Sequence, residues 1–226
     1  LMPVYISQMF DEDIARLPSA DLFSNVKTIT SSGGNVTAKM IKDSKNTFQN
    51  ANFYSMHGLT EAFRSTYLDP SQVEIRPDSI GKAIADVELY VINENGKECG
   101  VSEVGELIHR GGYIYKGFWN APEQNAQRFK SVQILKDVID IEGQLTDEIV
   151  VATGDYVYKD EEGYFYFSAR HDDMIKTRGF RVSPYEIESV VEKNIPQIDQ
   201  CAVFGIENEL IEEEIIMVYS AINEIS

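Results

Sequence analysis

The stretch SARHDDMIKTRGFRVSPYEIE, residues 168–188, decides how the C-terminal part of the chain folds. Its second half has the composition of a helix start, because Ser183 offers a capping hydroxyl and Pro184 suits the first helical position. Glu186 stands where a carboxylate can return to the amide of the cap residue, as in a capping box. Apolar residues with helical spacing follow as far as Pro196, so we predict a helix that begins at residue 184 and ends before this proline.

Two short apolar runs follow this helix, at residues 202–205 and 215–219, and predict two strands that pack on it. Upstream, residues 80–169 alternate between apolar and polar side chains, which is typical of half-buried strands. Asn95-Gly96 supplies a turn with positive φ between two of them. The pattern predicts an antiparallel β unit, in which the more polar residues 130–148 form a loop or an insertion.

The N-terminal part of the chain mixes helical stretches with short apolar runs. Residues 26–30 predict a buried strand, and residues 37–48 predict a helix opened by a threonine cap. We therefore predict three parts: an α/β region in residues 1–79, a β-barrel-like subdomain in residues 80–170, and a small α+β C-terminal domain in residues 171–226.

The composition argues against several classes of partner. The chain of 226 residues has 37 acidic and 20 basic side chains, which gives a formal net charge of -17. This charge repels phosphate backbones and anionic bilayers, so it argues against nucleic acid and membrane partners. Cys99 and Cys201 lie far apart and indicate neither a disulfide framework nor a thiolate zinc site. No apolar run is long enough to span a bilayer, and no signal-peptide pattern is present, so we expect a cytoplasmic protein.

Two glycine-containing motifs predict contacts with a ligand. Gly33 and Gly34 follow a predicted strand, where paired glycines let a ligand approach the backbone; a tight turn is the alternative. The motif His57-Gly58-Leu59-Thr60-Glu61 places a hydroxyl beside a carboxylate. The hydroxyl of Thr60 can donate to a phosphate oxygen, and the carboxylate of Glu61 is a hard oxygen ligand for Mg²⁺. The alternative for Thr60 and Glu61 is helix capping.

A lone carboxylate and a basic stretch are further candidates. Asp155 follows a Thr-Gly pair between two apolar strands and can accept hydrogen bonds from both hydroxyls of a ribose; an Asp in a β-turn is the alternative. Residues 168–181 concentrate basic side chains, including Arg170, Lys176 and Arg181, in an otherwise acidic chain. This local charge can bind phosphate, and an ordinary solvated hairpin is the alternative.

Two classes of active site are absent from the sequence pattern. The histidines, His57, His109 and His171, lack metal-ligand spacing, which argues against a histidine-based metal site. No Gly-x-Ser-x-Gly motif is present, which argues against a serine hydrolase.

Five motifs occur in a fixed order along the chain. They are Ser31 to Gly34, Gly58 to Glu61, Gly105-Glu106-Leu107 with Gly117 to Asn120, Thr153 to Asp155, and Arg170 to Glu188. Over nearly the whole chain, this series resembles the adenylate-forming superfamily of acyl-CoA synthetases, luciferases and peptide-synthetase adenylation domains. Residues 61–68 are similar to a bacterial acyl-CoA ligase subgroup associated with exosortase systems.

The resemblance implies roles in nucleotide binding for matched positions in the first half of the chain. Gly33 and Gly34 would line the adenine slot, and His57 stands where most relatives have a tyrosine that stacks on the base. Thr60 would hold the α-phosphate, and Glu61 would bind Mg²⁺.

The second half would supply the ribose contacts and the residues of a second half-reaction. Asp155 would hold the ribose hydroxyls, and Arg170 would contact ribose or phosphate. Asp172 matches the hinge about which the C-terminal domain rotates between half-reactions. In the rotated state Lys176 would approach the adenylate and Gly179 would line the pantetheine tunnel.

In that state Arg181 would meet phosphate, whereas the matched positions Gly105 to Leu107 and Trp119 are expected to be structural. The implied reaction has two steps: a small carboxylic acid attacks the α-phosphate of ATP to give acyl-AMP and pyrophosphate, and the thiol of coenzyme A then displaces AMP. Magnesium ion is the implied cofactor.

The resemblance also implies that the chain is part of a longer enzyme. The phosphate loop of the family and the lysine near its C-terminus are missing from this sequence, so we expect the chain alone to be inactive. One alternative is an adenylation domain that loads a carrier protein, although residues 182–188 look more like the CoA-ligase form. The other alternative is a non-catalytic remnant that binds nucleotides.

Overall fold

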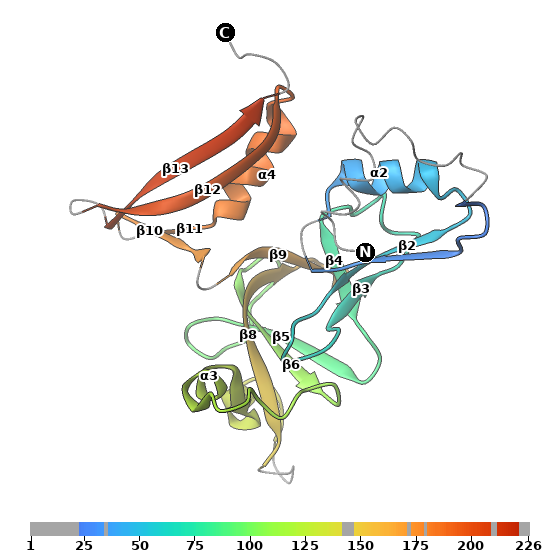
Figure 1. The fold of residues 1–226 in the computed structure, drawn as a ribbon. Helices are drawn as coiled ribbons and strands as arrows, with labels where there is room; N and C mark the ends of the chain where they lie inside the picture. Colours follow the sequence, from blue (N-terminus) through green and yellow to red (C-terminus); the bar gives the residue numbers. More distant parts are fainter. Residues whose placement is uncertain are drawn as a thin grey trace. The chain divides into compact units, whose positions relative to one another are not determined.

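The computed structural model describes residues 23–33, 36–141, 147–170, 173–178, 180–208 and 212–221 (Figure 1). These residues form two compact units. The larger unit contains the described residues up to Thr153 together with Tyr158–Phe167, and the smaller unit contains Gly154–Val157 and the described residues from Ser168 onward. Within this described part of the chain, no helix is long and apolar enough to cross a membrane.

One large sheet runs through the larger unit. Its strands are β1 (Thr28–Ser31), β2 (Asn52–His57), β3 (Thr66–Leu68), β4 (Ser79–Ala83), β5 (Val87–Ile92), β6 (Gly105–Gly111), β7 (Phe129–Ser131), β8 (Ile149–Lys159) and β9 (Phe165–Arg170). Their pairing order is β1-β2-β3-β4-β9-β8-β6-β5, and β7 pairs with β8. The helices of this unit are α2 (Ala38–Thr47), α3 (Pro122–Arg128) and the short 3₁₀ helix η3 (Val132–Leu135).

The N-terminal end of the sheet is a parallel βαβ unit. β1 and β2 are parallel, and α2 connects them. The helix begins where the sequence predicts, because the amide of Met40 donates a hydrogen bond to Thr37 Oγ1 at 3.2 Å. The buried core here includes Ile29 of β1, Ile41 of α2 and Phe53 of β2. The α/β character predicted for this part of the chain is therefore confirmed.

The rest of the sheet is built from antiparallel pairs, among them β2–β3, β3–β4, β4–β9, β5–β6 and β7–β8. Gly96 has the predicted positive φ, of 75°. Residues 130–148 were predicted to form a loop or an insertion, and their first part contains β7 and η3. β7 pairs with β8, and this pairing places η3 against the sheet, where Val132 and Leu135 are buried with Val150.

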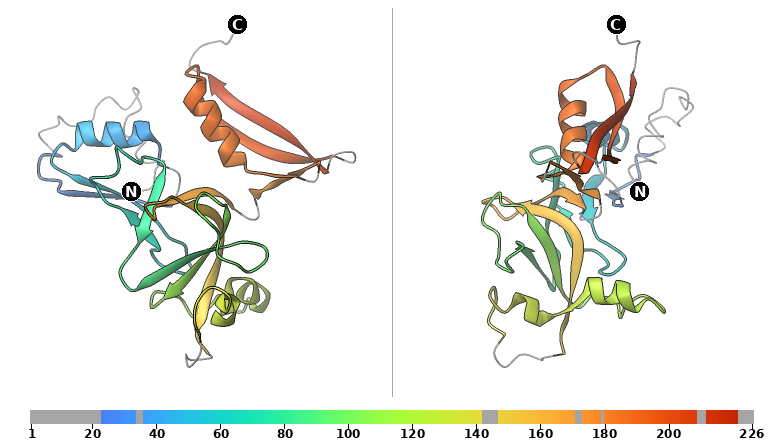
Figure 2. Two further views of the ribbon diagram at one scale, coloured as in Figure 1. Left: turned by 180° about the vertical axis from the view of Figure 1, so that it is seen from behind. Right: turned by 90° about the vertical axis from the view of Figure 1, so that its left-hand side faces the viewer.

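The smaller unit is a helix on an antiparallel sheet. Its elements are β10 (Ile175–Thr177), β11 (Phe180–Val182), α4 (Pro184–Asn194), β12 (Ile198–Asn208) and β13 (Glu212–Ala221), and the strand order is β11-β10-β13-β12. α4 lies along the β12–β13 hairpin in each view (Figures 1 and 2). Both predicted strands are confirmed, and both are longer than predicted because their pairing extends beyond the apolar runs; α4 packs against β12.

The start of α4 follows the predicted capping pattern except at one residue. The amide of Glu186 donates to Ser183 Oγ at 3.2 Å, and Pro184 occupies the first helical turn. The prediction that the carboxylate of Glu186 returns to the cap amide is wrong. This carboxylate instead accepts a hydrogen bond from Ser168 Oγ at 2.9 Å, while Ser183 Oγ donates to the carbonyl of Ser168 at 2.6 Å. Ser168 therefore fastens the end of β9 to the start of α4.

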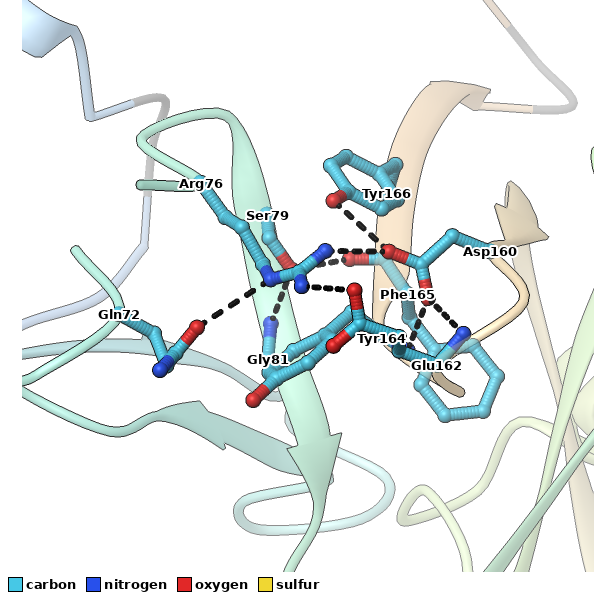
Figure 3. Close-up of polar contacts among 9 residues, drawn as sticks. All are labelled: Gln72, Arg76, Ser79, Gly81, Asp160, Glu162, Tyr164, Phe165 and Tyr166. Carbon is cyan, nitrogen blue, oxygen red and sulfur yellow. Dashed lines mark hydrogen bonds and ion pairs between the residues drawn. The ribbon is translucent and has the colours of Figure 1, made fainter. Parts of the chain in front are cut away.

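A polar cluster around Arg76 fastens the segment before β4 to the turn between β8 and β9 (Figure 3). Arg76 Nη1 lies 2.9 Å from Asp160 Oδ2, Nη2 contacts Glu162, and Nε donates to Gln72 Oε1 at 3.3 Å. The guanidinium carbon lies 4.3 Å from the centre of the Tyr164 ring. The hydrogen bond with Glu162 is the largest of the contacts that raise the pKa of Arg76 above its ordinary value.

Candidate functional site

Residues 57–61 form a loop with a constrained path directly after β2. The amide of Ser65 donates to the carbonyl of His57 at 2.9 Å, so the chain turns back on itself. Gly58 allows the close approach that this turn requires, because a Cβ atom there would lie 2.7 Å from the backbone nitrogen of Arg64. The loop is therefore held by backbone contacts.

Thr60 and Glu61 differ in exposure. Thr60 is exposed, whereas the side chain of Glu61 is only 13% exposed. The carbonyl of Glu61 accepts a hydrogen bond from the amide of Tyr115 at 2.9 Å. Since none of the helices in the described residues begins at Thr60 or Glu61, the alternative of helix capping is wrong.

Arg128 connects this loop to β8, although no pattern in the sequence indicates such a role. Its Nε lies 3.9 Å from Glu61 Oε1, and its Nη1 donates to the carbonyl of Thr153. Thr153 Oγ1 in turn donates to the carbonyl of Leu107 at 2.8 Å. Arg128 thus links Glu61 of the loop to Thr153 of β8. The partners of Arg128 lie far away in sequence, which is why local patterns did not reveal them.

Glu61 is a suitable ligand for a magnesium ion that arrives with a nucleotide. Among the described residues, no group of three or more His, Cys, Asp or Glu side chains is placed to hold a metal ion. Mg²⁺ often binds through one or two carboxylates and takes its other ligands from substrate phosphates and water. A single, largely buried carboxylate fits this kind of binding.

Asp155 and Arg170 are brought together in the smaller unit. Asp155 lies inside β8 and not in a turn, so the β-turn alternative is wrong; Gly154 before it has a φ of 70° within the strand. Arg170 Nε donates to Asp155 Oδ1 at 3.0 Å, and the side chains are 60% and 1% exposed, respectively. The pair therefore combines a buried acceptor for hydroxyl groups with a cation that reaches solvent.

His57 and Gly33 lie at the ends of neighbouring parallel strands. The ring centre of His57 lies 6.3 Å from that of Phe167, with the planes tilted by 39°. Such an aromatic environment suits a side chain that packs on a flat ring. Gly33 follows β1 and has a φ of 88°, a conformation that favours glycine.

The residues predicted to act in the second half-reaction are only partly described. Lys176 is exposed on β10, and its Cα pairs with that of Arg181 on β11. Gly34, Asp172 and Gly179 lie outside the described residues, so their roles in the adenine slot, the hinge and the pantetheine tunnel stay predictions.

The positions that were expected to be structural differ in burial. Gly105 is buried, and Leu107 is fully buried in the sheet. Trp119 is 98% exposed within the described residues, and its structural role stays a prediction. Its side chain lies on the segment before α3, where no described element covers it.

A buried polar pair lies behind the 57–61 loop and was not predicted as a pair. His109 is fully buried on β6, and its Nδ1 lies 2.9 Å from Ser65 Oγ. Burial lowers the pKa of His109 to about 4, which keeps the imidazole neutral near pH 7. Because the amide of Ser65 also donates to the carbonyl of His57, this pair supports the loop from the core side.

Comparison with known proteins assigns a family to this arrangement. The family model described as AMP-binding enzyme matches residues 2–119. The chain is 31% identical over 157 residues to the 2-succinylbenzoate–CoA ligase of Geobacillus kaustophilus, which covers 69% of this chain and 28% of that protein. It is also 32% identical over 177 residues to bacitracin synthase 1 of Bacillus licheniformis, covering 77% of this chain and 3% of that protein.

A solved structure shows the same fold. The o-succinylbenzoate coenzyme A synthetase of Bacillus subtilis, in complex with its acyl-adenylate intermediate, superposes with a TM-score of 0.74 at 21% sequence identity. The match covers 100% of this chain and 41% of that one. The fold class predicted for the chain, that of the C-terminal portion of an adenylate-forming enzyme, is therefore confirmed.

The chain belongs to the AMP-binding enzyme family, because the family model matches more than half of it. It spans only 28% of the length of the Geobacillus ligase that it matches. The predicted resemblance to the superfamily is confirmed, and the exosortase-associated subgroup stays a prediction.

Proposed function

We propose that the natural polypeptide containing this chain is an acid–thiol ligase that converts a carboxylic acid to an acyl-adenylate and passes the acyl group to coenzyme A. The observation that carries this proposal is the buried carboxylate of Asp155, held at 3.0 Å by Arg170 in a member of the AMP-binding enzyme family. A buried, oriented carboxylate is well suited to accept two hydroxyl hydrogen bonds from one ribose.

In this account, the remaining nucleotide contacts come from the ends of β1 and β2. His57 packs on the adenine, and Gly33 and Gly34 line its slot. Arg170, whose side chain is 60% exposed, contacts ribose or phosphate from the solvent side of the pair.

Adenylation uses the 57–61 loop. Thr60 donates its hydroxyl to the α-phosphate, and Glu61 is the ligand for Mg²⁺, which when bound neutralises phosphate charge. A carboxylate oxygen of the substrate attacks the α-phosphorus, and the bond from that phosphorus to the pyrophosphate oxygen breaks. Arg128 acts behind these groups, since it lies 3.9 Å from Glu61 Oε1 and contacts the carbonyl of Thr153.

Thiol transfer uses the β10–β11 hairpin after rotation about Asp172. The thiol sulfur of coenzyme A attacks the acyl carbonyl carbon, the bond to the AMP oxygen breaks, and AMP leaves. Lys176 approaches the adenylate, Gly179 lines the path of the pantetheine arm, and Arg181 meets phosphate. The same proposal takes residues 171–226 as a mobile C-terminal domain that is hinged at Asp172.

The acceptor thiol distinguishes this proposal from its main rival. The match to bacitracin synthase 1 covers 77% of the chain, which supports a carrier-protein thiol as the second candidate acceptor.

Cys99 and Cys201 are both free thiols, which supports a reducing cytoplasm as the place of action.

Carboxylate-dependent exchange of labelled pyrophosphate into ATP tests the first step. The natural polypeptide is assayed with acetate, octanoate and benzoate, and coenzyme A is then added to measure AMP release. We expect exchange with at least one acid class and AMP release that depends on coenzyme A. AMP release that requires a phosphopantetheinylated carrier protein would favour the rival, and binding of AMP without any exchange would favour a non-catalytic remnant.

A further inference from the structure

Among the described residues, the β10–β11 hairpin joins its sheet through the three-residue strand β10, which lies beside β13. Both strands have three residues, and in the described part of the chain Thr177 and Glu212 are the register pair between β10 and β13. Ile175 is 2% exposed and anchors the start of β10, whereas Lys176 and Phe180 are exposed. A hairpin held in this way needs a further fastening if its side chains are to keep a fixed position.

Glu213 of β13 supplies such a fastening. Its carboxylate accepts a hydrogen bond from the backbone amide of Lys176 on β10. An added Cβ atom at Gly205 of β12 would lie 2.7 Å from Glu213 Oε1 and 3.1 Å from Ile175 Cγ2. The missing side chain at Gly205 thus leaves the space through which Glu213 reaches β10. A charged acceptor makes a stronger hydrogen bond to an amide than a neutral one.

We propose that Glu213 is a positioning residue for thiol transfer, an inference that rests on the proposed function. The hairpin it fastens carries Lys176, Gly179 and Arg181, which that function assigns to the second half-reaction. None of the residues assigned to adenylation lies on β10 or β11. Loosening the hairpin should therefore slow thiol transfer and leave acyl-adenylate formation unchanged.

The neighbouring residue Glu214 offers a matched control. Glu214 carries the same charge as Glu213 and is exposed. Its Cα pairs with that of Ile206 in the β12–β13 hairpin. Replacing Glu214 with Ala changes the net charge of β13 in the same way as replacing Glu213 with Ala. It leaves the contact with the amide of Lys176 in place.

The experiment compares the natural polypeptide with its Glu213→Ala, Glu213→Gln and Glu214→Ala variants. Pyrophosphate exchange is measured with whichever of acetate, octanoate and benzoate gives the fastest exchange in the wild type. Loss of free thiol from coenzyme A is then followed under single turnover of preformed adenylate. We expect Glu213→Ala to slow thiol transfer about tenfold or more, because a hydrogen bond to a charged group is lost. Its rate of pyrophosphate exchange should stay that of the wild type.

The conservative variant and the control complete the comparison. Glu213→Gln keeps an oxygen acceptor and should recover part of the thiol-transfer rate, while Glu214→Ala should match the wild type in both steps. Equal losses in exchange and in thiol transfer would reduce Glu213 to a structural role and overturn the inference. Unchanged thiol transfer in Glu213→Ala would overturn it as well.

Amide hydrogen exchange separates failure of this inference from failure of the proposed function. The peptide that contains Ile175 to Thr177 should exchange about tenfold faster or more in Glu213→Ala than in Glu214→Ala, because the Lys176 amide loses its acceptor. If the wild type catalyses no pyrophosphate exchange with any acid, the proposed function fails. Amide hydrogen exchange still decides whether Glu213 fastens the hairpin. Identical amide hydrogen exchange of this peptide in Glu213→Ala and Glu214→Ala would show that Glu213 does not fasten the hairpin.

Discussion

Arg170 Nε donates a hydrogen bond to Asp155 Oδ1 at 3.0 Å, and the two side chains differ sharply in their exposure to solvent. Asp155 is 1% exposed, whereas Arg170 is 60% exposed. The carboxylate is thus oriented from one side by a cation that itself stays accessible. This is the arrangement expected of a buried acceptor that a nucleotide completes on binding.

Asp155→Asn should raise the KM for ATP in the exchange reaction by about tenfold to a hundredfold, because hydrogen bonds to a charged acceptor are replaced by weaker ones. Exchange kinetics over a range of ATP concentrations measure this change. The exposed Asp78 gives a matched control, since Asp78→Asn removes the same charge elsewhere in the chain. An unchanged KM in Asp155→Asn would remove Asp155 from the nucleotide site.

Arg128→Met should lower the free energy of unfolding by about 1–3 kcal/mol, because the contact with Glu61 and the hydrogen bond to the Thr153 carbonyl are both lost. Lys130→Met is the control, since Lys130 donates to the carbonyl of Ala126 at an exposed position and should change stability by less than about 0.5 kcal/mol. Urea unfolding measures both. Equal effects would show that Arg128 does not join the loop to β8.

Arg76→Met should lower the Tm by a few degrees at pH 7 and by less at pH 3. Burial raises the pKa of Asp160, but other contacts outweigh burial and leave this pKa below its ordinary value. These contacts are hydrogen bonds from the amide of Tyr164, the hydroxyl of Tyr166 and the amide of Glu162, together with the charge of Arg76. The stability that Asp160 contributes is therefore present above its unfolded pKa and is lost as the pH falls through its lower folded pKa.

Thermal unfolding at the two pH values checks the Arg76 prediction. Lys82 also lies over the ring of Tyr164, at 4.3 Å, so Lys82→Met tests the ring contact without the ion pairs. A loss in Arg76→Met that is the same at pH 7 and pH 3 would show that the ion pairs of Figure 3 contribute nothing to stability.

His109 should make the protein less stable as the pH falls from 7 to 5. Its folded pKa is about 4, against an ordinary value of 6.5, so the unfolded chain binds a proton in this window and the folded chain does not. The expected loss is about 2 kcal/mol, at about 1.4 kcal/mol per pKa unit. Urea unfolding of the wild type and of the double variant Ser65→Ala/His109→Leu measures it. If the free energy of unfolding depended on pH equally in both proteins, the lowered pKa of His109 would be contradicted.

Local signals in the sequence were sufficient for the helix starts. Thr37 and Ser183 each cap a helix, and both accept the predicted hydrogen bond from an amide three residues further on. Such caps depend on a few consecutive residues, so they can be inferred without the fold. The same holds for the turn at Gly96, which needs only a residue that tolerates positive φ.

Contacts between distant segments could not be predicted in this way. The carboxylate of Glu186 was expected at its own cap but accepts a hydrogen bond from Ser168, 18 residues away. Ser65 and His109 are separated by 44 residues. Val132 lies in a stretch that was predicted to be a loop or an insertion, and it is buried directly after β7, which pairs with β8. Sequence patterns report the preferences of one segment and cannot report which segment will lie beside it.

The candidate site was predicted in the same uneven manner. The resemblance identified Asp155 and Arg170 separately, and the structure brings them to 3.0 Å from each other. It did not indicate Arg128 or Glu213, because both contact backbone atoms of segments far away in sequence. The residues proposed to touch the ligand came from motifs, whereas these supporting contacts required coordinates.

The most direct test of adenylate formation is the fate of carboxylate oxygen. The natural polypeptide is supplied with a substrate carboxylate labelled with ¹⁸O, together with ATP, Mg²⁺ and coenzyme A, and the products are analysed by mass spectrometry. The proposed function predicts one labelled oxygen in AMP, because the carboxylate oxygen that attacks the α-phosphorus stays with AMP when the thiol displaces it. Label in inorganic phosphate with release of ADP, or acyl transfer without label in AMP, would contradict it.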